Sequence, residues 1–265
     1  MRTFSIGRSV LLLAAAAIGL VAGPGSAIAS QESPAPVSGY GSQMPETRDI
    51  QDDDDQNPGF LWVDYGAALW EEREAGSGKA CASCHGQAEE TMRGVGAIYP
   101  KFDAGTGKLM NLEQRINRCR AENQEAAAWP WETRELLAMT AFIRHQSRGM
   151  PISVDIDGPA RPFFEKGEAY FYRRMGQIDM SCAHCHENYV GKLLRSDLLT
   201  QAQINGWPVY SLGFTRIVST HEIFRHCNQK IRAEELDFGA DEYVNLELYM
   251  SWRGNGLAVE TPGVR

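Results

Sequence analysis

Residues 181–186 read SCAHCH and contain the spacing C-x-x-C-H, which attaches a c-type haem to a polypeptide. In that chemistry two thiols, here Cys182 and Cys185, bond to the vinyl groups of one porphyrin. The histidine that follows, here His186, becomes the proximal ligand of the iron. The stretch therefore predicts a haem c domain, a fold in which helices enclose the cofactor.

The same spacing occurs earlier in the chain, where residues 81–85 read CASCH. Cys81, Cys84 and His85 take the places of the two thiols and the proximal histidine. A zinc knuckle, a dithiol redox pair or a disulfide would each need only the cysteine spacing. None of them explains a histidine directly after the second cysteine in both copies, so we predict two covalently bound haems c.

The first 29 residues have the features of an export signal. Arg2 and Arg8 give a cationic front, residues 10–22 form an apolar run, and Ala27-Ile28-Ala29 is a small-residue cleavage site. The run is shorter than the about 20 residues that span a bilayer, and no later stretch is apolar enough, so we expect no membrane span in the mature protein. Export agrees with haem attachment, which bacteria complete outside the cytoplasm, and predicts the periplasm.

Residues 30–59 are rich in Pro, Ser, Gln and acidic residues, including the run Asp52–Asp55, and have almost nothing apolar to bury. We predict a flexible acidic arm. Removal of the signal with its two arginines changes the formal net charge from −8 to −10, and seven acidic residues with one arginine give the arm −6 of that. The body carries the remaining −4, so its charge indicates no particular binding partner, and we expect no nucleic acid.

The repeated haem motif divides the remaining residues into a first haem domain, 60–150, a linker, 151–162, and a second haem domain, 163–265. Apolar residues at helical spacing predict helices at 64–75, 111–120 and 132–145, and again at 163–174, 223–232 and 241–252. Helix, haem loop, helix and closing helix is the order of a class I cytochrome c. We therefore predict a mainly α protein with two tandem class I cytochrome c-like domains. Proline and glycine in the link disfavour a helix running through it.

The sixth ligand of each iron decides what each haem can do. In this fold it is usually a methionine, which would be Met150 or Met139 for the first haem and Met250 for the second. A further cysteine also follows each motif, and we favour thiolate ligation by Cys119 and Cys227, which lowers a haem's potential relative to methionine. A disulfide between these two cysteines is the alternative, and it would require the two domain interiors to face each other.

Several stretches resemble SoxA, the dihaem subunit of the SoxAX cytochrome of sulfur oxidation. They are NLEQRINRC at 111–119, GQIDMSCAHCHE at 176–187, RHCNQKIRAEELDFG at 225–239, LELYMSWRGNG at 246–256 and VETPGVR at 259–265. The resemblance covers essentially everything from Phe60 to the end of the chain.

The resemblance implies an L-cysteine S-thiosulfotransferase, which joins thiosulfate to a cysteine of the carrier SoxYZ and releases two electrons. It implies that Cys227 is both the distal ligand of the second haem and the catalytic residue, carrying an extra sulfur as a persulfide. Cys119 would be the distal ligand of the first haem, and His85 and His186 the proximal ligands. A monohaem SoxX subunit is the implied partner in a heterodimer.

Cations near Cys227 suit this chemistry, because they raise the acidity of a thiol and hold an anionic substrate. Relatives usually carry an arginine four residues before the catalytic cysteine, where this chain has Ile223. We take Arg225 as the substrate-binding residue, since relatives have an arginine there too, with Arg216 and Lys230 as substitutes. On a helix, Lys230 shares the face of Cys227.

Two other functions remain open. The first is a dihaem electron-transfer protein without chemistry of its own, for which methionine-ligated iron and no need for Cys227 are expected. The second is a haem sensor in which Cys227 leaves the iron in response to sulfide. A dihaem peroxidase would need an open distal site, and the two extra cysteines argue against that.

Overall fold

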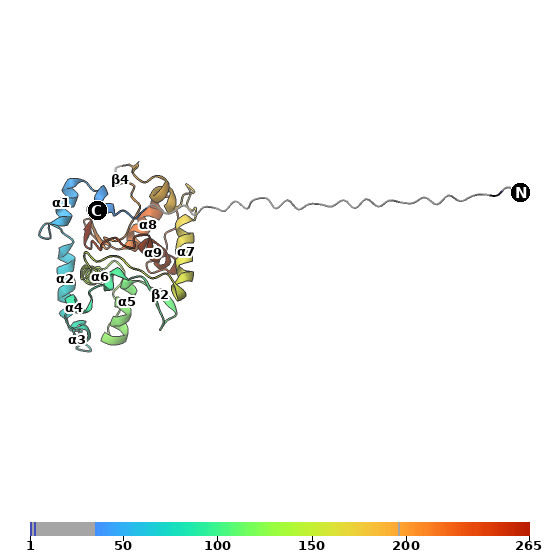
Figure 1. The fold of residues 1–265 in the computed structure, drawn as a ribbon. Coiled ribbons are helices and arrows are strands. Elements are labelled where there is room, and N and C mark those ends of the chain that lie inside the picture. The colour runs from blue at the N-terminus through green and yellow to red at the C-terminus, as the bar shows by residue number, and fades with distance from the viewer. Residues whose placement is uncertain (2, 4–34, 196) are drawn as a thin grey trace. The chain divides into compact units, whose positions relative to one another are not determined.

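The structure is a computed structural model that describes residues 1, 3, 35–195 and 197–265. The expected export signal, residues 1–29, lies outside these residues apart from positions 1 and 3. Contacts join Ala35–Arg265 into a single unit (Figure 1). Among the described residues, no helix is both long and apolar enough to cross a membrane.

The unit is mainly helical, with short strands between the helices. Its first half contains, in chain order, η1 Gly39–Ser42, α1 Pro45–Asp52, α2 Phe60–Glu71, α3 Ala82–His85, α4 Ala88–Thr91, η2 Val95–Ala97, β1 Lys101–Asp103, β2 Lys108–Met110, α5 Leu112–Cys119, η3 Arg120–Gln124 and α6 Arg134–His145. Its second half contains η4 Gly158–Ala160, α7 Arg161–Tyr172, η5 His184–Asn188, β3 Leu193–Leu194, β4 Asp197–Leu198, β5 Val209–Ser211, β6 Arg216–Val218, α8 Thr220–Lys230, α9 Asp241–Arg253 and β7 Gly263–Val264. Each helix that apolar spacing predicts is present, so the mainly α prediction is confirmed.

In each half, the helix before the haem loop packs along the closing helix at a glycine. α2 packs on α6 and α7 packs on α9 (Figure 1). A Cβ atom on Gly66 would collide with the carbonyl oxygen of Ala138, and one on Gly167 with that of Asn245. Only glycine permits this approach of two helix backbones. The haem loops, which follow α2 and α7, therefore start from equivalent helix pairs.

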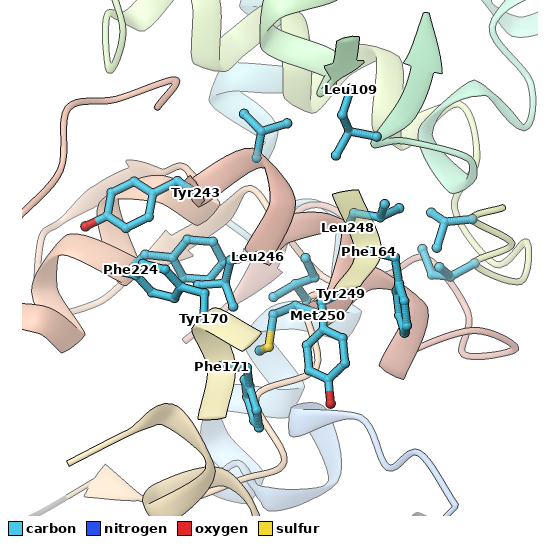
Figure 2. Close-up of a cluster of buried hydrophobic side chains, with 14 of the residues drawn as sticks. Leu109, Phe164, Tyr170, Phe171, Phe224, Tyr243, Leu246, Leu248, Tyr249 and Met250 are labelled. Atoms are coloured by element: carbon cyan, nitrogen blue, oxygen red, sulfur yellow. The ribbon is translucent and has the colours of Figure 1, made fainter. Parts of the chain in front are cut away.

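Buried apolar side chains gather in one cluster around α7 and α9 and in another around α2 and α6. Figure 2 shows the first of these, in which Phe164 and Phe171 of α7 pack against Tyr249 of α9 with ring centroids 5.5 and 5.2 Å apart. Leu109 of β2 belongs to this cluster although it comes from the first half, and Ile217 of β6 belongs to the other. The two halves thus exchange core side chains.

The strands are short and serve mainly to fix loops. β1 and β2 form an antiparallel hairpin, as do β3 and β4, where Leu193 lies opposite Leu198. The remaining strands have the order β6-β5-β7, with β5 antiparallel to β6 and parallel to β7. Val209 of β5 lies opposite Gly263, so the C-terminal strand completes this sheet.

Of the flexible arm predicted over residues 30–59, the structure describes residues 35–59 and corrects the prediction there. η1 and α1 are ordered elements, and α1 packs on β7. The Gln51 side-chain oxygen accepts a hydrogen bond from the backbone N–H of Val264 at 2.9 Å, and Asn57 Nδ2 donates to the carbonyl of Pro262 at 2.9 Å. Both side chains are buried. Composition misled the prediction because buried hydrogen bonds, rather than apolar area, attach this segment to the C-terminus.

Candidate functional site

Each C-x-x-C-H loop is closed by the side chain that precedes its second cysteine. In the first loop Ser83 Oγ accepts a hydrogen bond from the backbone N–H of Ala80 at 2.9 Å. In the second, His184 Nδ1 accepts from the backbone N–H of Ser181 at 3.1 Å. Each bond satisfies an amide at the start of a short helical turn, as an N-cap does, so the turn can present two thiols and a histidine. His184 therefore closes the loop.

The first loop brings Cys81, Cys84 and His85 against α2, where the rings of His85 and Trp70 lie 5.7 Å apart between centroids. Cys119 is the last residue of α5, and its charge acts on the Cys81 thiol. The pKa of the Cys81 thiol is raised to about 11, mainly by burial and in part by the charge of the nearby Cys119. The structure thus unites the four residues that the sequence assigned to the first haem.

A cavity of about 300 Å³ is lined by Gln124, Arg120 and Trp129 and by the carboxylates of Glu72, Glu74 and Glu135. Gln124 Nε2 donates to Cys81 Sγ at 3.6 Å, and Gln124 Oε1 is buried without a hydrogen-bond partner among the described residues. The Arg120 guanidinium lies 3.7 Å from the centroid of the Trp129 ring. Arg120 is already paired with Glu74 at 2.6 Å, so this acidic cavity does not suit the carboxylate substituents of a porphyrin. The loop itself fits the cofactor, because two thiols followed by an imidazole are the groups that hold a haem c.

The second loop holds its histidine in the form that binds a metal. His186 Nδ1 lies 2.8 Å from the carbonyl oxygen of Thr200, a bond that places the proton on Nδ1 and leaves Nε2 for an iron. Burial lowers the pKa of His186, so the imidazole is held neutral. The pKa of the Cys182 thiol is raised to about 12, mainly by burial and then by the charges of Cys227 and Cys185. The charge of the distal cysteine predicted for the second haem therefore acts on an attachment thiol of its own half.

The rotation of α8 sets where Cys227 points. The next residue, Asn228, is buried, and its Nδ2 lies within hydrogen-bond distance of Tyr170 Oη at 3.1 Å, Tyr243 Oη at 3.0 Å and the carbonyl of Glu234 at 3.1 Å. Tyr170 and Tyr243 belong to the cluster in Figure 2. Because Asn228 is bonded into the core, the adjacent Cys227 is directed to the second haem loop.

The surroundings of Cys227 disfavour a thiolate unless a cation stabilises it. Its pKa is raised to about 11, mainly by burial, and the charges of Cys185 and Asp197 act in the same direction. The charge of Lys230 acts in the opposite direction. A bound iron would place a much larger positive charge at the sulfur than Lys230 does. Such a charge makes a coordinating thiol lose its proton outright. The site therefore suits a thiolate bound to a metal.

All six cysteines are free, so the alternative of a disulfide between Cys119 and Cys227 is wrong. The charge of Cys119 acts instead on Cys81, and that of Cys227 acts on Cys182, each within its own half. Of the methionines considered as ligands, Met139 and Met250 are buried in the two apolar clusters, Met250 among the aromatic rings of Figure 2. Each half thus supplies one further free cysteine besides the two of its haem loop.

The structure places the predicted substrate residue, Arg225, in other contacts. Its guanidinium forms an ion pair with Glu235 at 2.8 Å, donates to the carbonyl of Leu236 and lies 4.7 Å from the centroid of the Phe238 ring. These contacts fasten the segment after α8 to the helix.

Sequence reasoning missed three groups at the second loop. The carbonyl of Thr200 orients His186, and Asp197 of β4 forms an ion pair with Lys230 at 2.9 Å. Arg253 of α9 is nearly buried and helps to lower the pKa of His186, after the larger effect of burial. A backbone carbonyl has no sequence signal, and the two charged residues lie far from the motif along the chain.

The family model of the SoxA/TsdA cytochrome c domain matches residues 65–152. The chain is 44% identical to the L-cysteine S-thiosulfotransferase subunit SoxA of Rhodovulum sulfidophilum over 228 residues. These residues cover 86% of this chain and 79% of the relative. The subunit of the same name from Pseudaminobacter salicylatoxidans is 43% identical over 230 residues, 86% of this chain and 80% of the relative. The crystal structure of SoxXA from P. pantotrophus matches with a TM-score of 0.83 at 42% identity, over 86% of each chain.

Proposed function

This chain belongs to the SoxA family of L-cysteine S-thiosulfotransferase subunits, and from that premise we propose that it joins thiosulfate to a cysteine of a SoxYZ-like carrier through Cys227. The observation that carries the proposal is the rotation of α8, in which Asn228 bonds to Tyr170 and Tyr243 and so directs Cys227 to the second haem loop. The charges of Lys230 and Cys185 act on the Cys227 thiol. An electron carrier would not need a third thiol at this place.

The chain holds two haems c, in domains at residues 60–150 and 163–265. The attachment thiols are Cys81 and Cys84 for the first and Cys182 and Cys185 for the second, and the proximal ligands are His85 and His186. The glycine crossings of α2 with α6 and of α7 with α9 support this repeat. In each half, one helix of the pair precedes the haem loop and the other follows it.

Cys119 and Cys227 are the distal ligands. Cys119 acts electrostatically on Cys81 and Cys227 on Cys182, and these effects within each half support the assignment. The imidazole of His186, held by the carbonyl of Thr200, offers Nε2 from the loop, and Cys227 approaches from α8. Thiolate ligation lowers the potential of each haem relative to methionine ligation.

The reaction forms one sulfur–sulfur bond and releases two electrons. Cys227, as a thiolate or as a persulfide, bonds to the outer sulfur of thiosulfate, and two electrons leave. The carrier thiolate then attacks that outer sulfur, and the sulfur of Cys227 departs as the leaving group. The carrier keeps the thiosulfonate, and the site returns to its first state. The haems, when bound, supply the electron acceptors for this oxidation.

The family and the sequence also indicate the setting of the reaction. The matching crystal structure is that of SoxXA, and a SoxX-like monohaem cytochrome is the partner in a heterodimer here. The expected export signal favours the periplasm as the location of both subunits. The carrier must reach Cys227, and the exposed side chains of Asp197 and Lys230 mark the nearby surface at which it would approach.

Two measurements on the mature protein test the haem assignment. A pyridine haemochrome assay should return two haems per chain, and near-infrared magnetic circular dichroism of the oxidised protein should show His/thiolate ligation. One haem per chain, or a His/Met signature at the second haem, would contradict the proposal. Co-expression with the small cytochrome of its operon should yield a heterodimer, and a strict monomer under gentle conditions would overturn that part.

A further inference from the structure

An anionic substrate at the distal cysteine needs a cation, and the basic residues near α8 differ in how free they are. Arg225 is paired with Glu235 at 2.8 Å. Arg216 is paired with Glu132 at 3.0 Å and with Glu222 at 3.2 Å. These carboxylates are at most 28% exposed, so the pairs are shielded from water and the two guanidinium charges are already balanced.

Lys230 differs from both arginines in position and in exposure. It is the last residue of α8, three positions after Cys227 and on the same face of the helix. Its Nζ lies 2.9 Å from Asp197 Oδ2, and the two side chains are 37% and 63% exposed. Side chains three positions apart on a helix are neighbours on its surface, so the ammonium lies on the side of α8 that carries the reactive sulfur.

We infer that Lys230 is the cation that binds the anionic end of the substrate at Cys227, and that Asp197 is a counter-ion which the substrate replaces. The inference rests on the proposed function for the identity of the anion, thiosulfate, whose sulfonate oxygens accept charge-assisted hydrogen bonds. An exposed Lys–Asp pair contributes little to stability, so a dianion can displace Asp197 readily. A lysine on a flexible stem can turn from one acceptor to the other.

The two residues act on the substrate with opposite signs. Lys230 attracts the dianion, whereas Asp197 repels it and competes for the same ammonium. If the pair only fastened β4 to α8, loss of either partner would have the same effect. Opposite effects of the two substitutions therefore separate substrate binding from a purely structural role.

The first test measures thiosulfate kinetics with the haem-loaded heterodimer and its carrier. Lys230→Met should raise the KM for thiosulfate about tenfold, the size of one charge-assisted hydrogen bond, with a smaller change in kcat. Asp197→Asn should lower that KM, and Lys230→Arg should retain most of the affinity. Lys79→Met is the matched control, because it breaks a Lys–Glu pair of 2.7 Å and similar exposure in the first half, and it should leave the KM unchanged.

The second test does not depend on turnover. Iodoacetate is anionic and iodoacetamide is neutral, and both alkylate the same thiolate, so the ratio of their rates at the Cys227 peptide reports local charge. Lys230→Met should lower the iodoacetate-to-iodoacetamide ratio several-fold and Asp197→Asn should raise it. A ratio that neither substitution moves, or that both move in the same direction, overturns the inference and leaves the proposed function intact. A ratio that shifts as expected in a protein without thiosulfate turnover supports the charge assignment and contradicts the proposed function.

Discussion

A buried pair of carboxyl groups joins the two halves of the protein and makes its stability depend on pH. Glu113 of α5 and Glu247 of α9 are buried, and both act on the buried guanidinium of Arg144. Glu247 accepts a hydrogen bond from Asn111 Nδ2 at 2.9 Å and lies 3.2 Å from His221 Nε2. Burial, and after it the negative charge of Glu247, raise the pKa of Glu113 to about 8.

The substitution Glu113→Gln should remove this pH dependence. In the unfolded chain the carboxyl titrates near 4.5, so between pH 4.5 and 8 the folded state binds more protons than the unfolded state. Stability then falls as pH rises through that window, by up to about 1.4 kcal/mol per pH unit. Glutamine has the shape of the protonated carboxyl and cannot ionise. The free energy of unfolding of the variant, relative to the wild type, should therefore rise by roughly 2–3 kcal/mol between pH 5 and pH 7.

The assay is urea unfolding of the haem-loaded protein at pH 5, 6 and 7, followed by far-ultraviolet circular dichroism. Glu165→Gln is the control, because it removes a carboxyl that is 59% exposed on the surface of α7. A difference between Glu113→Gln and wild type that stays constant over this pH range would refute the reasoning, as would a difference that falls with pH.

Three further predictions concern packing and hydrogen bonds. Gly167→Ala should lower the free energy of unfolding in urea by about 2–3 kcal/mol, because the added methyl group would collide with α9. An unchanged midpoint of urea unfolding would argue against the close helix crossing. Asn228→Leu should lower the free energy of unfolding by about 2–3 kcal/mol, because it leaves buried hydroxyl groups unpaired. It should also broaden the absorption spectrum of the second haem, because α8 loses its fixed rotation. Wild-type stability and an unchanged spectrum would contradict this prediction. Gln51→Ala should lower stability by about 1–2 kcal/mol and make the C-terminal residues sensitive to carboxypeptidase, and full protection would show that α1 does not hold β7.

The features that the sequence predicted are those with local signals. The helices follow from apolar spacing within single segments, and α5 begins where Asn111 and Gln114 form a capping box. The haem loops follow from five adjacent residues. These signals need no knowledge of distant contacts, which is why they could be found in one sequence.

The features that the sequence did not predict depend on residues far apart in the chain. Gln51 bonds to Val264, and nothing near Gln51 indicates a buried position. The choice between Arg225 and Lys230 likewise depended on where carboxylates lie, and β5, β6 and most of α8 separate Asp197 from Lys230 along the chain. Charge and helical spacing can nominate a cation, but its partners decide whether it is free to bind a substrate.

The central claim is that Cys227 is the reactive sulfur, and thiosulfate-dependent conjugation to the carrier's cysteine tests it most directly. The measurement compares Cys227→Ser with Cys119→Ser in the haem-loaded heterodimer, using intact mass to detect the conjugated carrier. Cys227→Ser should abolish conjugation while both proposed haems stay attached, because the attachment that we propose uses Cys81, Cys84, Cys182 and Cys185. Cys119→Ser should change the spectrum of the first haem and leave much of the conjugation in place. Full turnover in the Cys227→Ser protein would contradict the claim and favour an electron carrier.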